Sequence, residues 1–303
     1  MIYTITLNPS VDYTMYLPDF SEGRTNRAVD EACSIGGKGL NVSTVLARLS
    51  IKNTAIAFVA GFTGELIEKE LDNDFIIPDL IRLDNGFTRI NVKIKSQEES
   101  EINGSGPVIS LSDSEKLFAK LDRLTSGDTL ILAGSIPKTL PKYYYSLIIE
   151  SVSKKDVRVV VDTEKQSLAD TLKYRPFLIK PNKNELEDFF DVNISDIDTV
   201  IKLAFGLKQM GAQNVLVSLG GKGAVLIDSN EKVHKCEAVK GDVVSTTVGA
   251  GDSMIAGFIY GIDKYKDYEK ALRMGVACGC ACVFSQGLAE KDKIFDLYNS
   301  IMK

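Results

Sequence analysis

The segment Thr129-Leu130-Ile131-Leu132-Ala133-Gly134-Ser135 places five residues suited to a buried strand directly before a glycine and a serine. Short apolar runs that end in such a turn are typical of strands buried on both faces of a sheet. The same pattern returns along the chain. It predicts further strands at Tyr3–Leu7, Thr54–Val59, Val157–Val161, Phe177–Lys180 and Asn214–Ser218.

Amphipathic stretches separate most of these strands. They predict helices at Asn41–Leu49, Gly64–Leu71, Pro141–Glu150 and Ile197–Met210. The alternation predicts an α/β fold with a doubly wound, mainly parallel sheet covered by helices. After residue 218 two strands follow one another, Ala224–Asp228 and Lys232–Val239, which predicts an antiparallel edge. Two long helices, Gly251–Tyr260 and Tyr268–Ser285, are expected beyond them.

Four segments break this rhythm because they alternate polar and apolar residues with no helix between them. They are Asp12–Leu17, Asn26–Cys33, Thr88–Lys95 and Ser100–Asn103. Alternation with a period of two predicts strands that are half buried. We therefore expect one domain, residues 1–303, that carries a small four-stranded lid formed by residues 11–35 and 86–105.

Composition narrows the class of protein. The chain has 303 residues and a net charge of −5, which gives no reason to expect a nucleic acid or an anionic membrane as partner. Its N-terminus is strand-like and lacks the basic start of a signal peptide, and no uninterrupted apolar run is long enough for a membrane helix. These features predict a cytoplasmic protein.

The cysteines and the single histidine offer little chemistry. Cys278, Cys280 and Cys282 point in different directions on a helix and are interpreted as packing residues. His234 lies in an alternating stretch, where we expect it to face solvent. One histidine in the whole chain gives no support to a serine–histidine–aspartate triad centred elsewhere.

The segment Thr246-Thr247-Val248-Gly249-Ala250-Gly251-Asp252 carries the clearest chemical signal. An apolar run follows it and predicts a buried helix, so Gly249, Ala250 and Gly251 leave backbone N–H groups bare at a helix start. Such a start favours a bound anion. A carboxylate beside it suits a base that takes a proton from a nucleophile attacking that anion, as phosphoryl transfer requires. The alternative is that Asp252 only caps the helix.

Other polar residues should gather at the same place, since ligands of open α/β sheets bind beyond the carboxyl ends of the strands. One candidate is the segment Gly36-Gly37-Lys38-Gly39 with Asn41, which lets a ligand approach the backbone closely and supplies a cation and an amide. The alternative is that these glycines form only a flexible hinge. The remaining candidates for substrate contact are Asp12, Arg89, Asn91 and Lys138. Asn182 and Glu185 follow Lys180 at a helix start, where spacing alone favours a capping box over a site near magnesium.

Together these motifs resemble those of the ribokinase-like, PfkB-type carbohydrate kinases. The segments Thr246–Asp252 and Gly36–Asn41 resemble the two signatures of that family. Lys180-Pro181-Asn182-x-x-Glu185 and Ser218-Leu219-Gly220 match other landmarks in the same order. The opening Thr6–Asp12 is similar to the branch that acts on sugar phosphates, and the resemblance covers nearly the whole chain.

The resemblance implies a role for each candidate. Asp252 would be the base, Gly249, Ala250 and Gly251 the anion hole, and Asp12, Gly37 and Asn41 the ligands of sugar hydroxyls. Lys38, Arg89 and Lys138 would bind the phosphate already on the sugar, with Asn91 beside Arg89. Lys180, Asn182, Ser218 and Gly220 would serve the nucleotide, and Glu185 the Mg²⁺ of Mg-ATP. A homodimer through the lid is expected from the family.

Two positions depart from the pattern. Thr246 stands where many members have aspartate, and its lack of a carboxylate is what the resemblance to the sugar-phosphate branch leads us to expect. Asp162 is followed by Thr163-Glu164 rather than by the glycine frequent in relatives, so no role is assigned to it.

The function that this resemblance implies is ATP- and Mg²⁺-dependent phosphorylation of a ketohexose monophosphate, first of all D-fructose 1-phosphate to the 1,6-bisphosphate. Tagatose 6-phosphate is the alternative acceptor. A non-catalytic sugar-phosphate sensor is the alternative from another class, although an intact Asp252 beside an anion hole argues against it. An oxidoreductase is disfavoured because no Gly-x-Gly-x-x-Gly follows the first strand.

Overall fold

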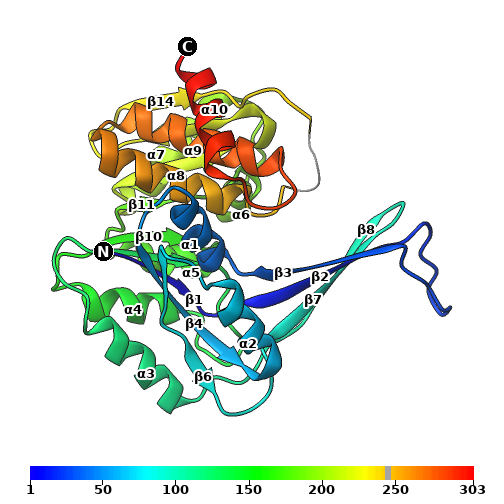
Figure 1. Ribbon diagram of the computed structural model, residues 1–303. Coiled ribbons are helices and arrows are strands. Elements are labelled where there is room, and N and C mark those ends of the chain that lie inside the picture. The colour runs from blue at the N-terminus through cyan, green and yellow to red at the C-terminus, as the bar shows by residue number, and fades with distance from the viewer. Residues whose placement is uncertain (243–246) are drawn as a thin grey trace.

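The computed structural model describes residues 1–242 and 247–303, and a large ten-stranded sheet forms its centre (Figure 1). The strand order is β14-β13-β12-β11-β10-β9-β1-β4-β5, with β6 paired to β4. Every pairing from β12 to β5 is parallel, and β13 and β14 form the antiparallel edge predicted from the sequence. The strands are β1 (Ile2–Thr6), β4 (Asn53–Ala60), β5 (Ile76–Pro78), β6 (Ile81–Leu83), β9 (Thr129–Ala133), β10 (Arg158–Asp162), β11 (Leu178–Ile179), β12 (Asn214–Ser218), β13 (Ala224–Ile227) and β14 (Val233–Cys236).

Helices cover both faces of this sheet. On one face lie α1 (Lys38–Arg48), α8 (Ala250–Tyr265), α9 (Tyr268–Val283) and α10 (Lys291–Met302). On the other lie α3 (Leu111–Leu121), α4 (Tyr144–Val152), α5 (Lys165–Leu172), α6 (Lys183–Phe190) and α7 (Ile197–Gln209). The helix α2 (Gly61–Glu70) packs on β4 beside the small sheet. The doubly wound fold predicted from the sequence is thus confirmed.

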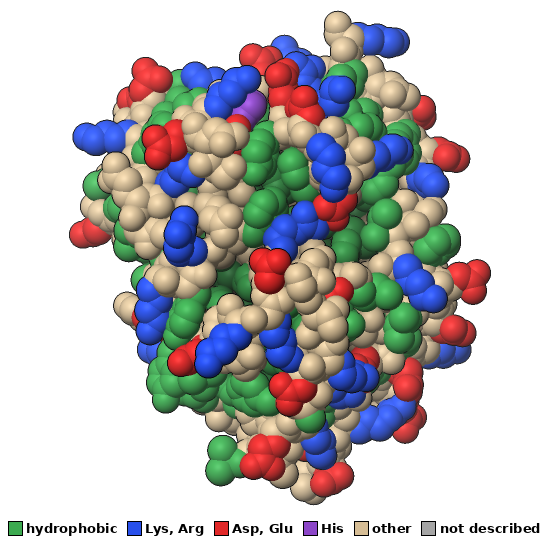
Figure 2. Space-filling model, turned by 90° about the vertical axis from the view of Figure 1, so that its left-hand side faces the viewer, with side chains coloured by type: hydrophobic (Ala, Val, Ile, Leu, Met, Phe, Trp, Pro, Cys, Tyr) green, Lys and Arg blue, Asp and Glu red, His purple; other side chains and the backbone are tan. Residues whose placement is uncertain are grey.

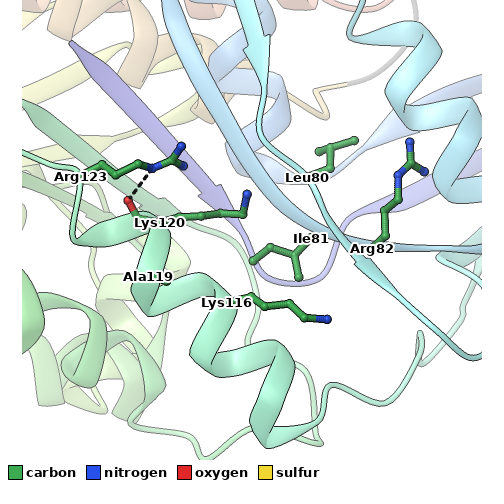
Figure 3. Close-up of a pocket in the computed structure, with 7 residues that line it drawn as sticks. All are labelled: Leu80, Ile81, Arg82, Lys116, Ala119, Lys120 and Arg123. Carbon is green, nitrogen blue, oxygen red and sulfur yellow. Dashed lines mark hydrogen bonds between the residues drawn. The ribbon is translucent and has the colours of Figure 1, made fainter.

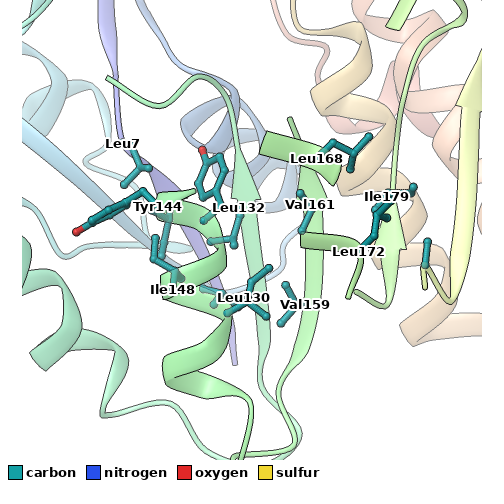
Figure 4. Close-up of a cluster of buried hydrophobic side chains, with 14 of the residues drawn as sticks. Leu7, Leu130, Leu132, Tyr144, Ile148, Val159, Val161, Leu168, Leu172 and Ile179 are labelled. Carbon is teal, nitrogen blue, oxygen red and sulfur yellow. The ribbon is translucent and has the colours of Figure 1, made fainter. Parts of the chain in front are cut away.

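Two layers of apolar side chains hold the helices to the sheet. Alternate residues of β9 and β10 point to opposite faces, so Leu130 and Leu132 join one layer while Ile131 joins the other. Figure 4 shows the first layer, where Ile148 of α4 and Leu168 of α5 pack over these strands. Burial of both faces is why the central strands read as continuous apolar runs.

The four predicted lid strands form a separate sheet that projects from the main body (Figure 1). We call it the small sheet. Its order is β3-β2-β7-β8, with β2 and β7 parallel and both outer pairs antiparallel. The strands are β2 (Ser10–Tyr16), β3 (Asp30–Gly36), β7 (Arg89–Lys95) and β8 (Glu99–Asn103). The strand β3 begins later than predicted and continues to the first glycine of the motif at residue 36.

Three helices, α3, α5 and α10, were not predicted. Helix α3 begins with a capping box in which Ser110 and Asp113 satisfy each other's backbone N–H groups. The expectation for His234 was wrong. His234 is buried, and its ring Nε2 lies 2.8 Å from Oδ2 of Asp228. The cysteines of α9, by contrast, are buried packing residues as predicted.

No helix in the described part of the chain is long and apolar enough to cross a bilayer. On the face shown in Figure 2, basic and acidic side chains are interspersed rather than gathered by sign.

Candidate active site

The predicted motifs lie at the starts of three helices near the carboxyl edge of the parallel strands. Gly37 precedes α1, Asn182 caps α6, and Gly249 precedes α8. Gly249 has a left-handed backbone with φ of 82°, which favours glycine, and the N–H groups of the first turn of α8 receive no side-chain cap. The helix start predicted to bind an anion is therefore present without a side-chain cap from the described residues, although the N–H of Ala250 donates to the backbone oxygen of Thr247 at 3.2 Å. Thr246 lies outside the described residues.

Asp252 is the third residue of α8 and does not act as its cap, so the capping alternative was wrong. The side chain is 5% exposed, and Asn41 of α1 donates a hydrogen bond of 2.7 Å from its Nδ2 to Oδ2 of Asp252. This contact joins the two glycine-rich motifs across 211 residues of sequence.

Burial, and after it the negative charge of Asp162, raise the pKa of Asp252 from its ordinary value of 3.8 to about 6. The hydrogen bond from Asn41 and the charges of Lys38 and Lys180 oppose this rise. A carboxyl group poised near neutrality suits a general base.

Two lysines flank Asp162 beside this carboxyl. Oδ2 of Asp162 lies 3.5 Å from Nζ of Lys38, and Oδ1 lies 3.4 Å from Nζ of Lys180. Lys38 also lies 4.0 Å from Oε1 of Glu185. Burial alone would lower the pKa of Lys38, but the neighbouring carboxylates, led by Asp162, outweigh it and raise that pKa. Lys38 therefore stays charged.

Lys180 lies over the start of α8. A methyl group added at Gly251 would come within 3.0 Å of Nζ of Lys180, and the lysine side chain is only 4% exposed. A buried ammonium group next to a helix N-terminus repels the helix dipole, and an anion between them would relieve the repulsion. The arrangement thus favours a dianionic group at this point.

The glycines before α1 have a role in packing as well. A methyl group at Gly39 would lie 2.4 Å from Oγ1 of Thr6, and one at Gly37, where φ is 122°, would lie 2.7 Å from Cγ2 of Thr6. The helix α1 can approach β1 only because these side chains are missing. The motif is therefore an ordered helix start, not a flexible hinge.

A second polar cluster lies at the base of the small sheet. Oδ1 of Asp12 accepts hydrogen bonds from Ser10 (2.7 Å) and from Asn91 (3.0 Å), while Oδ2 pairs with Lys93 at 2.9 Å. The parallel register of β2 and β7 sets Asp12 opposite Asn91. Arg89, on the same face as Asn91, donates from Nε to the backbone oxygen of Asn8 at 3.2 Å, and burial lowers its pKa.

The other predicted residues lie in a helix cap, at the end of a strand and in exposed loops. Asn182 and Glu185 form a reciprocal capping box, with bonds of 2.8 Å in both directions, as their spacing predicted. Ser218 ends β12 beside Asn182, and Gly220 begins an exposed 3₁₀ turn (Gly220–Lys222). Lys138 is exposed in the loop after β9.

Comparison with known proteins agrees with this geometry. The model of the pfkB family carbohydrate kinases matches residues 5–294. This chain belongs to the pfkB family. It is 41% identical to the 1-phosphofructokinase of Bacillus subtilis (strain 168), over 98% of this chain and 97% of that protein. It is 36% identical to the D-tagatose-1-phosphate kinase of Bacillus licheniformis, over 97% and 96%. Its fold matches the tetrameric inhibited form of phosphofructokinase-2 from Escherichia coli with a TM-score of 0.91 at 27% identity, covering 100% of this chain and 99% of that one.

Two charged residues near the site of this pfkB-family kinase were not predicted from the sequence. Asp162 received no role because no glycine follows it, although its place directly after a buried strand was the signal that identified the other residues. Lys93 was not predicted to be a site residue because it fits the ordinary alternation of polar and apolar residues along β7. Its pairing with Asp12 follows from the register of two strands far apart in sequence.

A separate groove of about 550 Å³ lies between β6 and α3 (Figure 3). Its walls carry Arg82, Lys116, Lys120 and Arg123. All four already have acidic partners, which are Glu68 for Arg82, Asp113 for Lys116, and Asp79 for the other two. The groove therefore offers little uncompensated charge to an anion.

The raised pKa of Asp252 predicts a stability cost. The folded protein favours the protonated carboxyl, so its contribution to the free energy of unfolding is complete below the ordinary pKa of 3.8 and is lost as pH rises through about 6. The variant Asp252→Asn has no carboxyl that titrates at this position, so it does not lose stability in this way as pH rises. The variant should gain roughly 1–3 kcal/mol over the parent between pH 5 and pH 7.5, measured by urea unfolding.

The exposed carboxyl of Asp72 provides the control, and Asp72→Asn should show no such trend. An Asp252→Asn variant whose advantage is constant with pH would contradict the assignment of a raised pKa.

Proposed function

We propose that this chain phosphorylates D-fructose 1-phosphate to fructose 1,6-bisphosphate with ATP. The observation that carries the proposal is the buried carboxyl of Asp252, with its raised pKa, in the first turn of α8, which has no side-chain cap among the described residues. The substrate follows from the 41% identity to a protein named 1-phosphofructokinase. Such an enzyme would work in the cytoplasm, where ATP and sugar phosphates are found together.

In this reaction Asp252 takes the proton from the C6 hydroxyl of the sugar. The oxygen then forms a bond to the γ-phosphorus of ATP, while the bond from that phosphorus to the β–γ bridging oxygen breaks and ADP leaves. Asn41 holds the Asp252 carboxylate in a fixed orientation through its hydrogen bond. A base with a pKa near working pH is ionised when the hydroxyl binds and accepts the proton readily.

The transferring phosphoryl group is assigned to the start of α8. Backbone N–H groups of Gly249, Ala250 and Gly251 would stabilise its charge, and Lys180 lies against Gly251 to add a cation. Donors that are already oriented need no rearrangement in the transition state. Lys38, held between Asp162 and Glu185, would balance charge between the sugar and nucleotide phosphates.

The sugar is assigned to the base of the small sheet. Asp12, Gly37 and Asn41 would bind its hydroxyls, and Asn91 would keep Asp12 oriented. Arg89 and Lys138, which come from two different segments, would bind the 1-phosphate, for which a guanidinium group is well shaped. The small sheet would act as the lid of a single domain and exclude water that competes as acceptor.

The nucleotide is assigned to the opposite side, near Asn182, Ser218 and Gly220. Glu185 fits a role toward Mg²⁺. Its Oε2 accepts a hydrogen bond from the N–H of Asn182, while Oε1 lies 4.0 Å from Nζ of Lys38, its ion-pair partner among the described residues. Within residues 1–242 and 247–303, no three side chains of the metal-binding types form a cage, as suits an ion that keeps most of its waters. When bound, Mg²⁺ would neutralise phosphate charge.

Tagatose 1-phosphate is a second candidate acceptor, favoured by the 36% identity to a D-tagatose-1-phosphate kinase. It differs from fructose 1-phosphate in the configuration of one hydroxyl, so contacts such as those of Asp12 and Asn41 would decide between them. Tagatose 6-phosphate carries its phosphate at the other end of the sugar and would need a different set of cations.

Release of ADP from Mg-ATP should be measured with fructose 1-phosphate, tagatose 1-phosphate, tagatose 6-phosphate and fructose 6-phosphate offered separately. The proposal expects the highest kcat/KM with fructose 1-phosphate. A preference for either 6-phosphate would overturn the assignment of Arg89 and Lys138, and binding without turnover would indicate a sensor.

Asp252→Asn should lower kcat by about 10²–10⁴-fold, the usual contribution of a general base. Binding of fructose 1-phosphate, measured by calorimetry, should change little because the amide keeps the size of the side chain. Near-normal turnover of the variant would remove Asp252 from the mechanism.

We also propose that the chain forms a homodimer through the small sheet. The paired residues Cys33, Tyr13, Val92 and Ile102 form one row across its four strands. Cys33 and Ile102 are exposed, and Ile102 is 62% exposed. An apolar row on a projecting sheet is suited to burial against a second copy.

Light scattering tests this contact. Ile102→Glu should convert a dimer into a monomer, whereas Glu101→Gln, which changes the opposite face of the same strand, should leave it intact. A dimer that survives Ile102→Glu, or a monomeric parent protein, would contradict the proposal.

A further inference from the structure

Asp162 is a buried carboxylate whose environment is unusual. It ends β10 and is 1% exposed, yet neither of its oxygens takes part in a hydrogen bond with described residues. Its nearest charged neighbours are the ammonium groups of Lys38 and Lys180, at 3.5 and 3.4 Å. A buried charge without hydrogen bonds costs free energy, so a residue kept only for stability would not be expected to look like this.

Asp228 shows the usual solution in the same protein. It is 2% exposed and directly follows β13, where it accepts bonds from the backbone N–H groups of Asn230 (2.8 Å) and Lys232 (3.0 Å). Its other oxygen bonds His234 at 2.8 Å. Every oxygen of Asp228 is thus satisfied by its own neighbourhood, whereas Asp162 has only two lysines from distant segments.

Those lysines meet at Asp162 from different elements. Lys38 is the first residue of α1, and Lys180 follows β11, so each oxygen of Asp162 faces a cation that another part of the fold supplies. Lys180 also lies against Gly251 at the start of α8, where the helix dipole repels a positive charge. Without a carboxylate at position 162, the two ammonium groups and the helix start would repel one another.

We propose that Asp162 is a positioning residue, which holds Lys38 and Lys180 on two sides of the transferring phosphoryl group. The proposal rests on the phosphoryl transfer proposed above. Asp162 itself does not touch the reacting atoms. It supplies the negative charge that lets two lysines remain beside the positive end of the α8 dipole before the substrates bind, so that no cation has to move during the reaction.

The proposal predicts opposite effects on binding and turnover in Asp162→Asn. Loss of the negative charge leaves both lysines uncompensated, so the affinity for ATP should rise by about threefold or more. The lysines would then move apart, and kcat should fall by about 10- to 100-fold, since small misplacements in an active site are costly. A merely damaged site would bind ATP more weakly, not more tightly.

The pH dependence supplies a second readout. Asp252 is faced by Asp162, Lys38, Lys180 and the thiol of Cys282, and the charge of Asp162 helps to raise its pKa. In Asp162→Asn the acid limb of kcat/KM should therefore move to lower pH. Titration of the substrate phosphates is common to both proteins and cancels in the comparison.

Calorimetric titration with ATP and steady-state kinetics on the full chain test the proposal. Asp228→Asn, which neutralises a buried carboxyl elsewhere, is the matched control and should leave the ATP affinity and the acid limb unchanged. Weaker ATP binding by Asp162→Asn, or an unchanged kcat, would overturn the proposal. The ATP titration needs no sugar, so it decides this point even if fructose 1-phosphate is not the acceptor.

The double variant Asp162→Asn with Lys180→Met is a control for misfolding, because it removes one negative and one positive buried charge together. If Asp162 acts through Lys180, the double variant should have a kcat within about threefold of Lys180→Met alone. Losses that multiply would show that Asp162 acts independently and would overturn the proposal.

Discussion

The site depends on the electrostatics of four buried or half-buried charges at the start of α8. Asp252 and Asp162 repel each other, and Lys38 and Lys180 lie where they offset that repulsion. Removing these groups from water makes each interaction stronger than it would be at the surface. The same burial raises the pKa of Asp252, so the feature that costs stability is also the one that creates a base.

The fold brings these charges together through the parallel sheet. The strands β10 and β11 end at the same edge, so Asp162 and Lys180 become neighbours. The first residues of α1 and α8 complete the group because both helices lie on one face of the sheet and contact each other. Glycines 37, 39, 249 and 251 permit the close approach of backbone that this arrangement requires.

The sequence predicted the parts of this structure that depend on local pattern. The apolar runs became buried strands, with the predicted bounds for Thr129–Ala133 and bounds shifted by one residue for others such as β1, and Asn182 with Glu185 formed the expected capping box. Contacts between distant segments were harder to predict. The burial of His234 depends on its pairing with Asp228 across a turn, and the importance of Asp162 depends on two lysines, 124 and 18 residues away (162 − 38 and 180 − 162).

Direct titration of the Asp252 carboxyl tests the account most directly. Its ¹³C resonance can be assigned by comparing the parent protein with Asp252→Asn, and followed as pH changes in the absence of substrates. We expect a midpoint near the raised pKa of about 6. A midpoint at the ordinary value of 3.8 would show that burial and Asp162 do not shape this carboxyl, and would contradict its role as the base.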